Sequence, residues 1–232
     1  MSPRPVTLIA LLTMLPLGAS QAAPQLDFTG IVRDVEIMQK VDNQLTVTMW
    51  MPEQYWRASF QSNNTLTDNA KEEFLEALRP YTLVAVVDAK VGVAGAFTFS
   101  SAETLNAKVR VEDSAGNTYA PIDAQDLSAS VKNLQQIMKP ILTNVMGPLG
   151  SNFELMVFPA TGKNGERIAD ATKEGSFTVR VGEQRFRYRL PLASLLPPVV
   201  DSRTGDSFPG NYHFNPYTGA RLSPAPAPAE HK

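Results

Sequence analysis

Hydrophobic and polar residues alternate over several short stretches of this chain, as they do in β-strands that bury one face. Residues 26–37 and 44–51 show this alternation, and Asp42 and Asn43 between them favour a turn. Residues 81–88 are almost all apolar, which predicts a strand buried on both faces. The strands predicted in this way lie at 26–37, 44–51, 81–88, 91–99, 105–112, 118–122, 153–158, 175–181 and 185–190.

Two segments instead repeat their apolar residues every three or four positions, which predicts helices. The first is 67–79, where Thr67 or Asp68 can cap the N-terminus and Pro80 ends the helix. The second is 124–146, which contains a proline, Pro140, that should kink the helix or split it in two. Its apolar stripe should pack against the sheet and consists of Leu127, Val131, Leu134, Met138, Ile141 and Val145.

Three arginines alternate with three apolar residues in the last predicted strand, 185–190. An arginine face of this kind can bind an anion or a glycan. The simpler interpretation, which we favour, is a solvated outer face of an antiparallel sheet with acidic residues opposite.

Short strands, two helices and turn-rich connections together predict a mainly β fold, an antiparallel β-sandwich with two helical insertions over 23–198. One short segment adds a family resemblance. Asp113, Gly116, Tyr119 and Pro121 follow a predicted strand in a pattern that resembles Ig-like modules of exported bacterial proteins.

The composition changes after Pro198, where two half-motifs follow one another. Residues 201–205 are D-S-R-T-G and residues 215–219 are N-P-Y-T-G. The whole segment 199–222 resembles a zinc ribbon in the spacing of its two turns and in the residues around them. At the positions where that family places four cysteines, this chain has Asp201, Thr204, Asn215 and Thr218.

The resemblance implies two tight turns, in which Gly205 and Gly219 would supply the positive φ angle. The side chains of Asp201 and Asn215 can accept the backbone N–H groups that point at a thiolate in a zinc ribbon, as in Asx-turns. Threonine hydroxyls can add hydrogen bonds between the turns. We therefore expect a small metal-free, ribbon-like hairpin module over 199–222, folded partly against the sandwich.

A hard-metal site is the alternative for this module. Asp201, Asp206, His213 and Asn215 could offer oxygen and nitrogen ligands to calcium or zinc. Carboxylates are few and threonine is a poor ligand, so the metal-free interpretation is favoured. The proline- and alanine-rich residues 223–232 predict a disordered tail.

Residues 1–22 have the pattern of a cleavable secretory signal. Arg4 precedes the apolar stretch 6–17, and Ser20 and Ala22 suit the small-residue positions of a signal-peptidase site. The stretch is shorter than the roughly 20 apolar residues that span a bilayer, and no later segment is apolar enough to do so. We expect a periplasmic or secreted mature protein.

The amino-acid composition excludes several kinds of functional site. The 232 residues include no cysteine and only two histidines, which excludes disulfides, thiolate metal sites and cysteine nucleophiles and makes a histidine-dependent triad improbable. The net charge is −2, so no broad basic surface for nucleic acid is implied.

Trp50, Tyr55 and Trp56 are the candidate binding residues, because clustered aromatic side chains stack on sugars or peptides. The alternative is that both tryptophans anchor the core. The expected function is non-enzymatic binding or assembly at the cell envelope, with an envelope protein or a glycan as partner and no cofactor. The competing hypothesis is a periplasmic hydrolase that acts on glycan or peptide through carboxylates.

Overall fold

The computed structural model of the chain describes residues 25–61 and 66–225. The predicted signal, 1–22, lies outside the described residues, and so do residues 226–232 of the predicted tail. None of the helices in the described part is both long and apolar enough to cross a membrane.

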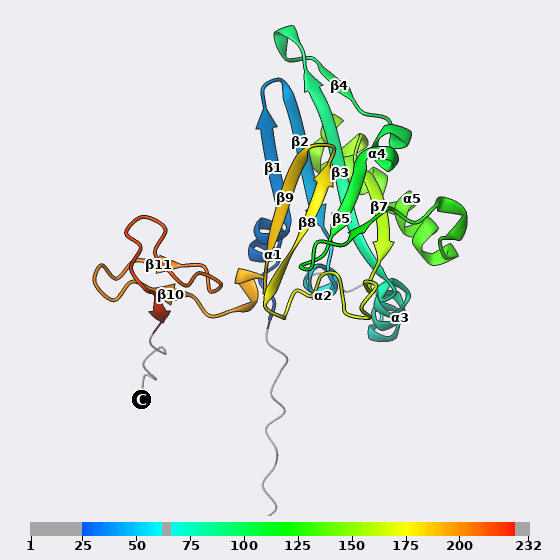
Figure 1. The fold of residues 1–232 in the computed structure, drawn as a ribbon. Coiled ribbons are helices and arrows are strands. Elements are labelled where there is room, and N and C mark those ends of the chain that lie inside the picture. Colours follow the sequence, from blue (N-terminus) through cyan, green and yellow to red (C-terminus); the bar gives the residue numbers. More distant parts are fainter. Residues whose placement is uncertain (1–24, 62–65, 226–232) are drawn as a thin grey trace, which may run out of the picture.

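Two antiparallel sheets form the body of the protein (Figure 1). The larger sheet consists of β1 (Glu36–Val41), β2 (Gln44–Trp50), β3 (Tyr81–Val91) and β4 (Phe97–Phe99), with β7 (Glu154–Pro159) also paired to β3. The smaller sheet has the order β6 (Thr118–Tyr119), β5 (Val109–Glu112), β8 (Gly175–Val181) and β9 (Gln184–Leu190). The mainly β fold with antiparallel sheets and helical insertions is confirmed.

Helices cover the ends and one side of the sheets. They are α1 (Phe28–Val35), α2 (Glu53–Gln61), α3 (Asp68–Leu78), α4 (Ala102–Lys108), α5 (Ala129–Met146) and α6 (Pro148–Ser151), with 3-10 turns η1 (Val93–Gly95), η2 (Ala124–Asp126) and η3 (Ala193–Leu195). In Figure 1, α2 and α3 lie at one end of the sandwich and α5 flanks β7.

Two of the predicted strands are partly helix, and 91–99 and 118–122 form strand over less than half of their length. Most of 26–37 is helix α1, because Ile31 and Val35 are four residues apart and bury the same helical face, so its apolar residues fit both periods. In 105–112, the first half belongs to α4, whose N-terminus is capped by Ser101. The alternation continues as a strand only from Val109.

Both predicted helices are present. Thr67 caps α3 by accepting a hydrogen bond from the backbone N–H of Ala70, at 3.3 Å. α5 continues through Pro140 as one helix and ends at Gly147, so the predicted split does not occur. The stripe residues Leu127, Val131, Leu134 and Met138 are buried as predicted. The side chains of Ile141 and Val145 lie outside the described ones.

An aromatic cluster between the sheets forms the centre of the core. The indole of Trp50, at the end of β2, makes edge-to-face contacts with Phe177 and Tyr188 of the opposite sheet, with ring centroids 4.8 and 6.1 Å apart. The Tyr188 hydroxyl lies 2.7 Å from the Thr48 hydroxyl, so the one polar atom of that ring is satisfied. These contacts join β2 to β8 and β9.

The arginines of β9 point away from this core. Arg185, Arg187 and Arg189 are exposed, whereas Phe186 and Tyr188 between them are buried. Arg185 forms an ion pair with Glu112 of β5, but its direct cross-strand neighbour on β8 is Arg180, so acidic residues do not lie opposite the arginines as predicted. The outer face is therefore a solvated sheet surface.

A buried carboxylate holds α4 against the larger sheet, and nothing in the sequence pattern indicated it. Asp88 of β3 is 1% exposed and accepts hydrogen bonds from Lys108, Thr46, Gln44 and Ser100. Burial alone raises the pKa of a carboxyl, but the Lys108 ammonium and the three neutral donors outweigh it. The pKa of Asp88 is therefore lowered.

We predict that Asp88→Asn destabilises the protein by about 2–3 kcal/mol at neutral pH, because Lys108 loses its counter-ion. A carboxyl with a lowered folded pKa stabilises the protein above its unfolded pKa, and this contribution is lost as the pH falls through the folded pKa. The difference in free energy of unfolding between the two proteins should therefore shrink below about pH 4. Urea denaturation at several pH values measures it; a difference independent of pH would contradict the assignment.

Candidate functional site

A cleft opens where β2 leaves the larger sheet. The last ladder contact on this side is the hydrogen bond from the backbone N–H of Met51 to the carbonyl of Leu83, at 2.9 Å. Pro52 follows and has no N–H to continue the ladder, so the chain turns away into α2. β3 begins two residues before Leu83, at Tyr81, and this end of it extends past β2.

Helices α2 and α3 form one side of the cleft. The carbonyl of Pro52 accepts hydrogen bonds from the first N–H groups of α2, those of Tyr55 and Trp56, at 3.0 and 3.4 Å. The start of α2 is thereby fixed, and Trp56 turns inward to pack edge-to-face on Phe74 of α3, at 5.2 Å between centroids. Leu75 and Leu78 of α3 complete this side.

The opposite side is the loop 167–172, which is held in place at both ends. Arg167 pairs with Thr161 in an isolated β-bridge, and the next residue, Ile168, donates its N–H to Ala160 at 2.9 Å. At the other end, the carbonyl of Ala171 accepts the N–H of Leu192 at 2.9 Å. Hydrogen bonds at both ends therefore hold this part of the cleft lining in place.

The cleft has a volume of about 250 Å³ and combines apolar with charged groups. This is roughly the space of eight water molecules, enough for a short segment of a larger ligand. Trp50, Trp56 and Leu83 provide apolar surface. The charged side chains that line it are Glu53, Arg79, Arg167 and Asp170.

Three of these four charged side chains form an ion pair with a residue of their own segment of chain. Glu53 pairs with Arg57 at 2.7 Å, Arg79 with Glu76 at 2.8 Å, and Asp170 with Lys173 at 3.7 Å. Among the residues that the structure describes, Arg167 forms no ion pair. The cleft thus presents one guanidinium that has no ion pair, although its charge acts on the carboxylate of Asp170.

The carboxyl of Asp170 is held in its charged form. Burial acts to raise its pKa, but hydrogen bonds from the hydroxyl and the N–H of Thr172, at 2.7 and 3.0 Å, and the charges of Lys173 and Arg167 outweigh it. The pKa of Asp170 is therefore lowered, and the group is an acceptor rather than a proton donor.

The three aromatic residues predicted to bind a ligand lie in different surroundings. Trp50 and Trp56 line the cleft but are only 2% and 6% exposed, so their rings are core residues that reach its surface. Tyr55 does not line the cleft and lies between Phe28 and Trp56, where burial raises its pKa. The Nε1 of Trp56 is buried and has no hydrogen-bond partner among the described residues.

The other residues of the cleft were not predicted from the sequence. Thr82, Arg167 and Asp170 lie in two segments more than 80 residues apart in the chain, and no local pattern joins them. The one available signal was Pro52, which shows where the β2 ladder has to stop.

The C-terminal module lies beside the sandwich and contains the two turns that the zinc-ribbon resemblance implies (Figure 1). Its small sheet has the order β11 (Ser207–Phe208), β10 (Val199–Val200) and β12 (Ser223–Pro224). Strand β12 lies within the predicted tail, so the expectation of disorder was wrong for its first residues. They are ordered because they pair with β10.

The two turns have the same backbone geometry. Gly205 donates its N–H to the carbonyl of Asp201, and Gly219 donates to the carbonyl of Asn215, both at 2.8 Å. The φ angles of the two glycines are 78° and 71°, a region that favours glycine.

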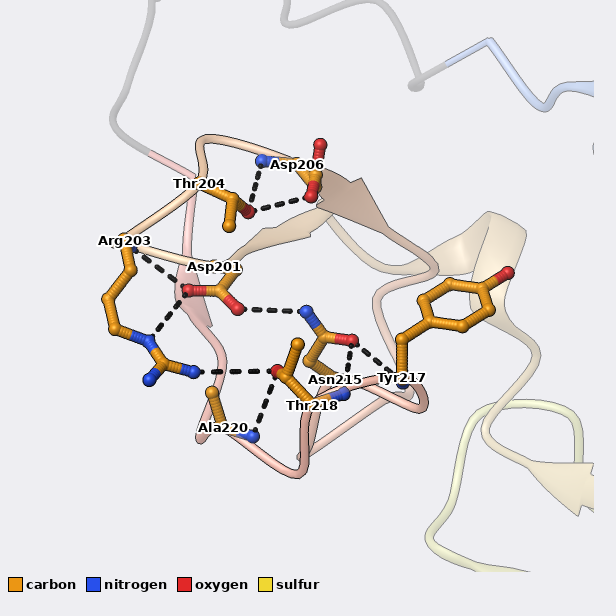
Figure 2. A network of polar contacts seen from close by, with 8 residues as sticks. All are labelled: Asp201, Arg203, Thr204, Asp206, Asn215, Tyr217, Thr218 and Ala220. Atoms are coloured by element: carbon orange, nitrogen blue, oxygen red, sulfur yellow. Dashed lines mark hydrogen bonds and ion pairs between the residues drawn. The ribbon is translucent and has the colours of Figure 1, made fainter.

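A buried amide–carboxylate bridge joins the turns (Figure 2). Asn215 donates its Nδ2 to the carboxylate of Asp201 at 2.8 Å, and both side chains are almost fully buried. The other oxygen of Asp201 accepts the N–H of Arg203, whereas Oδ1 of Asn215 accepts that of Tyr217, at 3.0 and 2.9 Å. The pKa of Asp201 is lowered, first by the Arg203 N–H and then by Asn215.

The two threonines have different roles in this network. Thr204 donates to Asp206 within its own turn at 2.7 Å. Thr218 accepts from the guanidinium of Arg203 across the two turns at 3.4 Å, so an arginine and one threonine add the second link between them. Tyr217 is 88% exposed and adds little to the packing of the module.

The module is attached to the sandwich through a close contact at Gly210. A Cβ at this position would lie 2.4 Å from the carbonyl oxygen of Pro197, so only glycine fits. Asn211 next to it donates to the carbonyl of Pro191 at 3.0 Å, and the guanidinium of Arg189 lies over the ring of Tyr212.

The alternative metal site finds its ligands engaged elsewhere. Asp201 is bound by Asn215 and Arg203, and Asp206 accepts from Thr204. Within residues 25–61 and 66–225, no three histidine, aspartate or glutamate side chains gather as a metal site would require.

No protein-family model, curated protein or solved structure matches this chain. The interpretation of the cleft and of the module therefore depends on their geometry.

We predict that Asn215→Ala opens the C-terminal module without unfolding the sandwich, because the substitution leaves one buried oxygen of the Asp201 carboxylate without its donor. Amide hydrogen exchange at Gly205 and Gly219 should accelerate at least about tenfold, while that of Val87 in β3 stays unchanged. Ser202→Ala, in the same turn but exposed, is the matched control. Unchanged exchange at both glycines would show that the bridge does not hold the module.

A second prediction concerns metal. Because Asp201 and Asn215 are bonded to each other and to backbone N–H groups of the two turns, we expect that removing divalent ions with a chelator leaves the exchange of Gly205 and Gly219 unchanged. The same preparation should contain no stoichiometric zinc or calcium by elemental analysis. Bound metal together with faster exchange after chelation would overturn the metal-free assignment.

Proposed function

We propose that this protein is an exported, non-enzymatic binding protein of the cell envelope that holds a short segment of its partner in the cleft beside Trp50 and Trp56. The signal-like pattern of residues 1–22 supports export to the periplasm or the medium. The observation that carries the binding role is the cleft itself, in which apolar ring edges and unmatched polar groups face the same space.

The composition of the cleft supports recognition of a polar segment. Thr82, Gln54 and Arg167 offer hydroxyl, amide and guanidinium groups within one small volume. Aromatic surface with a few convergent polar groups is typical of ligand sites in proteins. A glycan and a peptide both present apolar and hydrogen-bonding groups that suit such a cleft.

A hydrolase is the second candidate, because two carboxylates, those of Glu53 and Asp170, line the cleft. A hydrolase of this type needs one carboxyl with a raised pKa to act as general acid. Asp170 has a lowered pKa, and Glu53 is bound by Arg57. This arrangement supports binding in preference to hydrolysis.

The two tryptophans allow a direct test, since they are the only ones in the chain and both line the cleft. We predict that soluble peptidoglycan fragments, which carry both amino sugars and a short peptide, change the tryptophan emission in a saturable way. Gln54→Phe should abolish the change by filling the cleft. Gln61→Phe, an exposed position at the other end of α2, should not.

The fragments should be recovered intact by mass spectrometry. Cleavage that Gln54→Phe prevents would establish the hydrolase instead. No saturable change with any fragment would refute the assignment of the cleft.

A further inference from the structure

The end of β3 at Tyr81 has backbone groups that no described strand pairs with on the β2 side. β2 and β3 pair in a register that places Trp50 opposite Val84. Two steps further along, Pro52 would lie opposite Thr82, and the residue opposite Tyr81 would be Glu53, which already belongs to α2. On this side, Tyr81 therefore has no strand partner within residues 25–61 and 66–225.

The direction of the Tyr81 backbone follows from its neighbours. In a strand, the N–H and C=O of every second residue point to the same side. Leu83 accepts a hydrogen bond from Met51, on the β2 side, whereas Pro80 accepts from Ala160, on the β7 side. Tyr81 is two residues from Leu83, so both of its backbone polar groups point to the side that β2 has left.

This unpaired residue lies in the wall of the cleft. Tyr81, Leu83 and Met51 all line it, so the cleft adjoins the end of β3 where β2 has stopped. A donor and an acceptor at ladder spacing match the N–H and C=O of one residue in an extended peptide, the arrangement that strand addition uses. Sugar hydroxyls have no such fixed spacing, and this favours a peptide.

Arg167 gives the cleft a preference for a negatively charged ligand. It lines the cleft from the opposite wall and is the one charge there that has no ion pair among the described residues. Its side chain is exposed and its backbone is held by the bridge to Thr161. An arginine guanidinium can bind a carboxylate through paired hydrogen bonds.

We propose that the cleft takes a short extended peptide that bears a carboxylate, with one peptide residue paired to the backbone of Tyr81 and the carboxylate bound by Arg167. This inference rests on the proposed function and gives it a ligand class. The partner is then a protein or peptide with an exposed acidic strand-like segment, and the cleft adds that segment to β3 at the position where β2 stops.

The probe is N-acetyl-alanyl-aspartyl-alanine amide, titrated into the isotope-labelled full-length mature protein and followed by the amide resonance of Tyr81. We expect saturable shifts and slower hydrogen exchange at this amide. The asparaginyl analogue should bind about tenfold more weakly, because it lacks the charge that Arg167 recognises. The same peptide methylated on every backbone nitrogen should not protect the Tyr81 amide.

Variants separate the two contacts. Arg167→Gln should weaken the aspartyl peptide about tenfold and leave the asparaginyl analogue unchanged. Arg187→Gln, on the outer face of β9, is the matched control and should bind like the original protein. Equal binding of the aspartyl and asparaginyl peptides, or of the methylated one, would overturn the inference.

The outcome also distinguishes this inference from the proposed function. If a disaccharide of N-acetylated amino sugars shifts the tryptophan emission and the acidic peptide does not, the cleft binds glycan and only the peptide inference fails. If neither probe acts on the cleft, both proposals fail.

Discussion

The packing of Trp50 against Phe177 and Tyr188 is the contact on which the rest of the structure depends. It joins the last residue of β2 to the opposite sheet, just before Pro52 ends the β2 ladder and α2 begins. The same indole reaches the surface of the cleft. The core and the candidate site therefore share a side chain. The shape of the cleft depends on how the two sheets pack against each other.

The elements that could be predicted are those whose pattern fits a single period. Strand β9 alternates arginine with aromatic residues and has no helical alternative, and α3 has a cap, a helical face and a terminating proline. The predictions failed in segments whose apolar residues fit both strand alternation and the helical repeat. In 26–37, Ile31 and Val35 satisfy alternation and the helical repeat at once, and the deciding factor is packing against η3, which is more than 150 residues away in the chain.

The candidate sites differ in the same way. The turns of the C-terminal module are local, because each hydrogen bond that defines them spans a few residues, and the two turns were predicted from the sequence. The bond that joins Asn215 to Asp201 was not. The cleft is assembled from the end of β2, from α3 and from the loop 167–172. No window of sequence contains these parts together, so its ligand groups emerge only when the sheet register is known. Asp88 and its donors escaped prediction for the same reason.

The amide–carboxylate bridge of the module has a consequence for how the chain matures. A ribbon held by zinc cannot finish folding until an ion arrives, and its thiolates have to be kept from oxidants. Asp201 and Asn215 are encoded in the chain itself, and the bond between them forms as soon as the two turns meet. Because this part of the protein contains no cysteine, its folding requires no particular redox potential.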